Sequence, residues 1–208
     1  MHGRDSIIKG TAIVDFGAMG TVKAVFVTTN EHKRREAQAI LGVELEGASW
    51  DLPEIQALDV AEVAAEKALR AYDSLGAPEH PVLVEDSGLV VGAWNGLPGA
   101  LTKWFLSCVG NEGILRMLCG QDRSALAVCA VAVAGVDGQV RVFRGEVAGT
   151  LAPEPRGTGG FGWDPIFIPE GGELTYAQMG EAKNEDSHRA RALRAARGWL
   201  EEVVGREE

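Results

Sequence analysis

Residues 124–151 read SALAVCAVAVAGVDGQVRVFRGEVAGTL, and this stretch decides the fold class. Two long runs rich in valine and alanine flank the dipeptide Asp137-Gly138. Valine favours strands, and Asp-Gly is a preferred dipeptide in the tight turn between two antiparallel strands. The stretch therefore predicts a long β-hairpin.

One strand and two helices are expected well upstream of the hairpin. The strand, 23–29 (KAVFVTT), runs directly into a helix over 30–41, whose first turn Asn30 can cap. A second helix is expected over 59–75, where apolar residues recur at helical spacing behind a capping Asp59.

The segment 81–88, PVLVEDSG, is expected to be a buried strand that ends in two acids. Ser87 and Gly88 are then expected to turn the chain sharply. Residues 99–120 follow, and they favour two short helices that are broken at Gly110.

Strands and helices intermix around the antiparallel hairpin, and a last helix, 187–204, starts at Ser187. We therefore expect an α/β protein with helices packed on a mixed sheet. No low-complexity linker divides residues 23–208, which are interpreted as a single domain. Residues 1–22 show no clear period and are interpreted as an N-terminal extension. It is a native extra strand, a non-native cloning remnant without order, or a segment upstream of a chain that starts at Met19.

The composition excludes several classes of protein. Of the 208 residues, 46% are hydrophobic and 24% are charged, as in an ordinary globular protein. The net charge of −10 argues against broad binding to nucleic acid or to acidic membranes. No apolar run is long enough to span a bilayer, and the N-terminus does not look like a signal peptide. The three cysteines show no CxxC spacing, so we expect them to be reduced, in the cytoplasm.

A glycine-rich stretch, GTGGFG at 157–162, fits the dinucleotide-binding pattern GxGxxG. That pattern needs a helix directly after it, because the helix amides hold the pyrophosphate. Pro165 and Pro169 forbid a continuous helix here, and residues 166–168 look like a short strand. The match to the dinucleotide pattern is therefore interpreted as accidental.

The aromatic residues of this loop suggest a different ligand. Phe161 and Trp163 offer flat faces on which a purine can stack, and Asp164 can accept hydrogen bonds from a sugar or a base edge. Packing of both aromatic rings in the core is the structural alternative.

Thr28, Thr29 and Asn30 lie where the first strand turns into a helix, and Lys33 follows one turn later. A helix N-terminus offers amides and the positive end of the helix dipole to a phosphate group. A well-capped helix with a solvated basic face is the alternative. The chain has no GxxxxGK[ST] motif, which excludes an ordinary P-loop nucleotidase.

Glu85 and Asp86 directly follow the apolar run PVLV, and Glu54 lies in a loop, DLPEIQ. A carboxylate near the edge of a core needs a cation, a hydrogen-bond donor or a proton. Two carboxylates with room for water suit Mg²⁺, which prefers oxygen ligands. The alternatives are an Asx-type turn at Asp86 and a surface position for Glu54.

His188 and Arg189 fall in the first turn of the last helix, with Lys183 just upstream. Cations at a helix N-terminus oppose the helix dipole. Their placement indicates an anionic or keto-bearing ligand, and a simple solvated helix start is the alternative.

Nine short motifs between residues 23 and 203 occur in the order seen in one family. They are FVTTNEHK, DLPE, VLVEDSGL, GLPG, KWF, GFGWDPIF, TYAQM, EAKN and SHRARAL. The chain thus resembles the inosine triphosphate pyrophosphatase family, also called the Ham1 or RdgB-like family. The resemblance implies a two-lobed α/β fold with a long central mixed sheet and an active-site cleft between the lobes. It further implies a homodimeric, Mg²⁺-dependent enzyme that hydrolyses ITP, dITP and XTP to the monophosphate and pyrophosphate.

The resemblance also assigns roles to residues, by motif position. Asp86 is the implied proton acceptor, and Lys33 is the implied catalytic cation. The implied groups are a triphosphate cradle of Thr28, Thr29, Asn30 and Lys33, the metal ligands Glu54 and Asp86, the nucleotide contact Ser87, the base and ribose holders Phe161, Gly162, Trp163 and Asp164, and the purine-reading residues Lys183, His188 and Arg189.

Two rival functions stay open at this point. One is a related pyrophosphatase that acts on other modified or standard nucleotides, and the other is a non-catalytic nucleotide-binding protein on the same fold. The presence of Glu54, Asp86 and Lys33 together disfavours the second. The chain also departs from the family pattern, since Gln178 stands where glutamate is usual in TYAQM.

Overall fold

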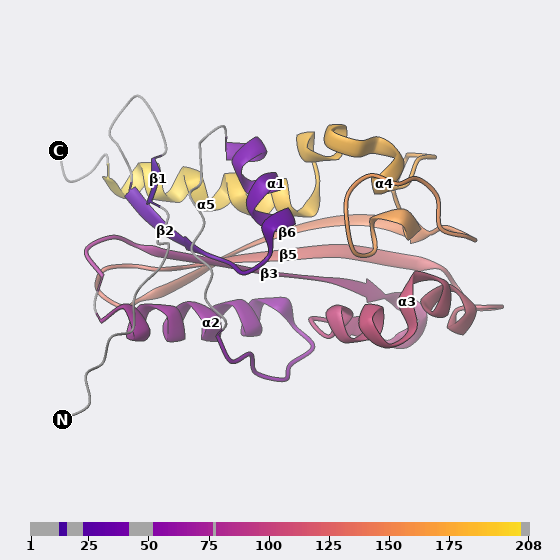
Figure 1. The fold of residues 1–208 in the computed structure, drawn as a ribbon, viewed down its shortest axis with the longest axis horizontal. Helices are drawn as coiled ribbons and strands as arrows, with labels where there is room; N and C mark the ends of the chain where they lie inside the picture. Colours follow the sequence, from indigo (N-terminus) through magenta and orange to yellow (C-terminus); the bar gives the residue numbers. More distant parts are fainter. Residues whose placement is uncertain (1–12, 16–22, 42–51, 77, 205–208) are drawn as a thin grey trace.

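A computed structural model describes residues 13–15, 23–41, 52–76 and 78–204. Within them, the strands form one seven-stranded sheet in the order β1-β2-β3-β5-β6-β7, and β4 pairs with β3 outside this path. Figure 1 shows the sheet as a twisted layer along the long axis of the molecule, with helices above and below it. The described residues thus confirm a mixed α/β fold built on a central sheet.

The predicted hairpin is the centre of this sheet. Strands β5 (Ser124–Ala134) and β6 (Val140–Leu151) pair antiparallel along their whole length, so the prediction from 124–151 is confirmed. Nearly every residue of β5 is buried, because β3 and β6 flank it and helices cover both of its faces. Strand β7 (Phe167–Pro169) extends the sheet beyond β6.

A parallel pair makes the sheet mixed. Strand β2 (Lys23–Val27) runs parallel to β3 (Val82–Val91), whereas the other pairings in the described sheet are antiparallel. Strand β1 (Ile13–Asp15) pairs antiparallel with β2 at the edge. It belongs to the predicted N-terminal extension, whose other residues lie outside the described part of the chain.

Helices cover the two faces of the sheet as their apolar faces require (Figure 1). Helix α1 (Glu31–Leu41) and helix α5 (His188–Val204) pack on one face, and helix α2 (Val60–Leu75) packs on the other. The Asp59 carboxylate accepts a hydrogen bond from the Ala61 amide, which confirms the predicted cap of α2. Among the described helices, none combines the length and the hydrophobicity that crossing a bilayer requires.

The sharp turn predicted at Ser87 and Gly88 is wrong. Strand β3 continues through both residues to Val91, because β5 pairs with it at every position of its length. Gly88 serves a close approach instead of a turn. A Cβ atom at this position would collide with the Gly99 carbonyl group of strand β4 (Pro98–Gly99). Glu85 and Asp86 therefore lie within a rigid strand of the sheet.

Helix α3 (Thr102–Met117) contains the predicted break. Gly110 has φ 66° and ψ −179°, so two short helices meet there at a kink. Three 3-10 helices complete the described helical structure: η1 (Gly92–Trp94), η2 (Asp164–Ile166) and η3 (Gly180–Glu185).

The short helix α4 (Tyr176–Met179) explains the departure at Gln178. The side-chain oxygen of Gln178 accepts a hydrogen bond from the Thr175 amide, and the Thr175 hydroxyl accepts one from the Gln178 amide. This reciprocal pair is a capping box, in which glutamine serves as well as glutamate. The substitution thus removes a charge and keeps the cap.

Candidate active site

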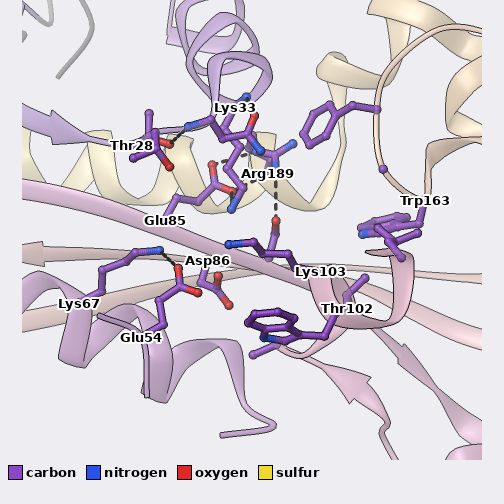
Figure 2. A pocket seen from close by; sticks show the side chains of 18 of the residues that line it. Thr28, Lys33, Glu54, Lys67, Glu85, Asp86, Thr102, Lys103, Trp163 and Arg189 are labelled. Carbon is purple, nitrogen blue, oxygen red and sulfur yellow. Dashed lines mark hydrogen bonds and ion pairs between the residues drawn. The ribbon is translucent and has the colours of Figure 1, made fainter. Parts of the chain in front are cut away.

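A cavity of about 730 Å³ opens between the α1 and α5 side of the sheet, the middle of α2 and the first half of α3. Its walls bring together the described residues that the sequence assigned to the site, with the exception of Lys183. They are Thr28, Thr29, Asn30, Lys33, Glu54, Asp86, Ser87, Phe161, Gly162, Trp163, Asp164, His188 and Arg189. Figure 2 shows that their side chains reach the cavity from several elements that lie far apart in the sequence.

The start of α1 forms one wall and is well capped. The Asn30 carboxamide oxygen accepts hydrogen bonds from the amides of His32 (3.0 Å) and Lys33 (3.2 Å), and the Thr28 hydroxyl accepts one from the Asn30 amide (3.1 Å). The predicted cap at Asn30 is therefore confirmed. The structural alternative, a well-capped helix, does not exclude a place at the cavity, because the residues of the capped turn line it.

Glu85 anchors the cations of this wall from within the sheet. Its carboxylate accepts two hydrogen bonds from Arg189, and Lys33 Nζ lies 3.3 Å from Glu85 Oε1. Burial acts to raise the pKa of Glu85, but the charges of Arg189 and Lys33 outweigh it and hold the pKa well below its ordinary value of 4.5. Glu85 is therefore an ionised structural acid.

Asp86, the next residue, lies in the opposite situation. Its side chain is 8% exposed, and its Oδ2 atom has no hydrogen-bond partner among the described residues. Burial raises the pKa of Asp86 to about 6, although the charges of Lys33 and Lys67 act to lower it. A buried carboxylate oxygen without a partner is costly, so this atom is suited to a cation or a proton.

Glu54 lies beside Asp86 at one end of the cavity, and its carboxylate contacts Lys67 Nζ at 2.5 Å (Figure 2). Partial burial acts to raise the pKa of Glu54, but the hydrogen bond from Lys67 lowers it overall. No group of three or more metal-ligating side chains occurs in the part of the chain that the structure describes. Mg²⁺ needs no such group, since it is commonly held by one or two carboxylates together with waters and phosphate oxygens. The carboxylates of Glu54 and Asp86, one of which has an oxygen without a partner, therefore fit this ion.

The loop over 161–164 forms the opposite end of the cavity. The Phe161 ring is half-buried, and the His32 ring stacks on it at a centroid distance of 5.0 Å and an angle of 21°. Gly160, with φ 66°, allows the chain to fold back so that the Asp164 carboxylate accepts a hydrogen bond from the Phe161 amide (2.8 Å). Phe161 thus presents an aromatic ring at the cavity, as its sequence context predicts.

Trp163 serves the core as well as the cavity. It is only 7% exposed and packs edge-on against Phe167 and near the rings of Tyr176 and His188. The structural alternative of core packing is therefore observed for Trp163, although an edge of the residue lines the cavity.

Lys183 lies behind the cavity wall and ties its elements together. Its Nζ atom is 2.5 Å from Asp164 Oδ2 and 2.5 Å from Glu36 Oε1. Glu36 also pairs with Arg189, so one carboxylate of α1 binds two cations near the loop. Both cations lie 5.3 Å from the centroid of the Phe161 ring.

His188 is buried and neutral at the same end of the cavity. Neither ring nitrogen has a hydrogen-bond partner among the described residues, and the ring stacks on Tyr176. Burial lowers the pKa of His188 well below 6.5, and the neighbouring charge of Arg189 adds to this effect. A neutral imidazole with an unused nitrogen can donate to, or accept from, a ligand edge.

Sequence reasoning missed three charged residues at or beside the cavity, Glu36, Lys67 and Lys103, and it did not foresee that Glu85 anchors the cations. Lys103 belongs to the KWF motif, and Glu85 precedes Asp86, so these two carried a local signal. Lys67 is 13 residues from its partner Glu54 and carried none. The lysines give the Glu54 and Asp86 end of the cavity positive charge, in a protein that is acidic overall.

The arrangement has two chemically distinct ends. Near Glu54 and Asp86, lysines and carboxylates can hold a metal ion and a polyphosphate. At the other end, an aromatic ring, a neutral histidine and a buried arginine can hold a flat heterocycle. The two ends together offer the chemistry that a nucleotide with several phosphates would require.

Comparison with known proteins agrees with this arrangement. The model of the Ham1 family matches residues 24–199. The chain is 43% identical over 191 residues to a dITP/XTP pyrophosphatase of Methanopyrus kandleri, which covers 89% of this chain and 100% of that protein. It is 45% identical over 187 residues to an inosine triphosphate pyrophosphatase of Aspergillus fumigatus, which covers 88% of this chain and 96% of that protein.

Solved structures extend the likeness to the fold. A HAM1 protein from Coxiella burnetii superimposes with a TM-score of 0.71 at 30% identity, covering 86% of this chain and 98% of that one. The Staphylococcus aureus Ham1 protein gives a TM-score of 0.70 at 29% identity. The motifs, the sheet and the cavity together lead to one conclusion: the chain belongs to the Ham1 family.

Proposed function

We propose that this protein hydrolyses non-standard purine nucleoside triphosphates, namely ITP, dITP and XTP, to the nucleoside monophosphate and pyrophosphate. Relatives that cover most of the chain carry the names dITP/XTP pyrophosphatase and inosine triphosphate pyrophosphatase. One observation carries the proposal: a single cavity joins the unpartnered Asp86 oxygen, beside Glu54, to the Phe161 ring and His188. Such an enzyme removes damaged nucleotides from the pool of precursors.

Glu54 and Asp86 are the residues that would hold Mg²⁺. When bound, the ion offsets phosphate charge and lowers the pKa of a coordinated water. Lys33, Lys67 and Lys103 line the same end of the cavity, where their ammonium groups can contact phosphate oxygens. Fixed cations of this kind stabilise the charge that develops during phosphoryl transfer.

Asp86 is the group that would take the proton from the attacking water. Without a bound cation, burial raises its pKa to about 6, so the carboxylate is a stronger base than an exposed aspartate. The water oxygen forms a bond to the α-phosphorus, the bond from that phosphorus to the bridging oxygen breaks, and pyrophosphate leaves. Neither Lys33 nor Asp86 needs to form a covalent intermediate.

The purine edge would be read at the other end. A donor from Arg189 or His188 suits a keto oxygen at position 6, whereas adenine has an amino group there. A buried donor left without a partner costs about 1 to 3 kcal/mol, which disfavours ATP. Phe161 would stack on the ring itself.

We also propose that the enzyme is a homodimer in the cytoplasm. Leu97, in the GLPG segment, and Trp104, in the helix after it, are 37% and 61% exposed, which is high for large apolar residues. Cys108, Cys119 and Cys129 are all free, in agreement with a reducing compartment. Sedimentation velocity tests the dimer, and a Trp104→Glu variant that sediments as the wild type would remove this surface from the proposal.

The central experiment measures pyrophosphate release from ITP, dITP, XTP, GTP and ATP, with and without Mg²⁺. We expect turnover of the first three that needs Mg²⁺. Equal use of ATP would favour the rival pyrophosphatase of standard nucleotides. Binding of ITP without any release of pyrophosphate would favour the non-catalytic rival.

A further inference from the structure

Asn111 connects helix α3 to the aromatic loop at the cavity. Its Nδ2 atom donates a hydrogen bond of 2.9 Å to the carbonyl oxygen of Gly162, a residue that is 51 positions away in the sequence. Asn111 directly follows the kink at Gly110, so it is the first residue of the second half of α3. The kink therefore determines where this side chain points.

The side chain does not act as a helix cap: Gly110, with its non-helical backbone, holds the N-cap position, and Asn111 is the first helical residue after it. A cap would use Asn111 Oδ1 to accept a hydrogen bond from an amide in the following turn. This atom is buried and has no hydrogen-bond partner among the described residues. The Asn111 side chain thus bonds to Gly162 in the loop and makes no hydrogen bond to its own helix.

Gly162 lies within the loop that forms one end of the cavity. Phe161 precedes it, and Trp163 and Asp164 follow it. The loop contacts α3 closely, since a Cβ atom at Gly162 would lie 3.5 Å from Leu106 Cδ1. On its far side, the loop is held by Lys183 through Asp164. Asn111 is therefore the polar contact that fixes the α3 side of a loop held on both sides.

We propose that Asn111 is a positioning residue for the purine: by holding the Gly162 carbonyl, it sets the place of the Phe161 ring in the cavity. This inference rests on the proposed function. Asn111 does not line the cavity, so it acts through Gly162 and Phe161 and does not contact the substrate. Loss of the bond frees the loop that binds the base and leaves the phosphate end unchanged.

The test compares three variants by steady-state kinetics with ITP. Asn111→Asp keeps the size and the capping ability of the side chain but cannot donate to a carbonyl oxygen. Asn111→Ala removes both abilities. We expect both variants to raise KM roughly three- to tenfold, the effect of one lost hydrogen bond, with kcat within about twofold of the wild type. The control, Glu112→Gln, changes the exposed neighbour on the same helix and leaves both constants unchanged.

The result that overturns the proposal is a wild-type KM in Asn111→Asp together with a raised KM in Asn111→Ala, because that pattern belongs to a cap. A wild-type KM in both variants also overturns it. A fall in kcat with KM unchanged in both variants overturns it as well, since it would place the effect at the phosphate end.

A second readout does not depend on turnover. The Phe161 amide is bonded to Asp164 Oδ2, and the Asp164 amide is bonded to the Phe161 carbonyl. We expect hydrogen exchange at these two amides to be roughly three- to tenfold faster in nucleotide-free Asn111→Asp than in the wild type. Unchanged exchange overturns the tether even if the enzyme is active. Faster exchange in a protein that fails to hydrolyse ITP would keep the tether and reject the proposed function.

Discussion

Arg189 donates two hydrogen bonds to Glu85, from Nε to Oε2 at 2.9 Å and from Nη2 to Oε1 at 3.0 Å (Figure 2). The pair joins the start of α5 to the middle of β3, and both side chains are buried. Glu85 also pairs with Lys33, and Arg189 with Glu36. These residues form one network of buried charges beneath the wall of the cavity.

Glu85→Gln is expected to destabilise the fold. The change leaves the buried charge of Lys33 without its carboxylate, and removal of one partner of a buried ion pair costs about 3 kcal/mol. Urea unfolding of the two proteins measures the loss. Glu31→Gln is the control, because Glu31 is an exposed partner of Arg34, and it should leave the unfolding midpoint unchanged. Equal midpoints for Glu85→Gln and the wild type would contradict the anchoring role.

Asp86→Asn is expected to abolish turnover and largely spare nucleotide binding. The amide cannot accept the proton of the attacking water, so kcat should fall by a factor of at least about 10². Pyrophosphate release measures turnover, and calorimetric titration with IMP measures binding. Full activity in this variant would remove Asp86 from the mechanism.

Phe161→Ala is expected to raise KM for every purine triphosphate that the enzyme uses. Loss of one stacking partner costs about 1 to 3 kcal/mol, so KM should increase roughly five- to 150-fold. The dependence on Mg²⁺ should stay the same, because the proposed metal ligands, Glu54 and Asp86, lie at the other end of the cavity. Phe161→Tyr keeps the flat ring and serves as the control. Unchanged kinetics in the alanine variant would assign Phe161 to packing alone.

His188 is expected to make stability depend on pH. The folded protein keeps this histidine neutral because burial lowers its pKa, whereas the unfolded chain binds a proton below about pH 6.5. Acid therefore favours the unfolded state, and the contribution of His188 to stability is lost as pH falls below 6.5. The loss grows progressively as the pH falls from 7 to 5.

The variant His188→Phe isolates this contribution, since the other titrating groups remain in both proteins. Urea unfolding at pH 7 and pH 5 should show a smaller loss of stability in the variant than in the wild type. An identical pH dependence of the two proteins would mean that folding does not lower the pKa of His188.

Local patterns in the sequence were sufficient for most of the elements. The hairpin, the caps at Asn30 and Asp59 and the break at Gly110 each depend on residues within a few positions of one another. The continuation of β3 through Gly88 does not, because its cause is pairing with β5 some forty residues later. A turn was the wrong inference from Ser87-Gly88, since glycine there makes room for another strand.

The candidate site shows the same division. Motifs placed the residues of the cavity walls, because each motif is a short local stretch. The ion pair of Glu36 with Lys183 joins residues far apart in the chain, and no spacing rule connects them. Pairing of this kind follows from the packing of α1 against α5 and the 3-10 helix η3, which only the folded chain reveals. The roles of the individual site residues stay predictions.

Because successive side chains of a strand point to opposite faces, the adjacent acids Glu85 and Asp86 of β3 lie on different faces of the sheet. Leu83 and Glu85 face α1 and α5, whereas Val84 and Asp86 face α2. A slip of the strand by a single residue would exchange their positions, so that the acid that pairs with the buried arginine would stand where Asp86, the proposed proton acceptor, now lies. The pairing of β3 with β2 on one side and β5 on the other fixes the register of the strand. This register keeps Glu85 with the buried arginine and Asp86 on the opposite face of the sheet.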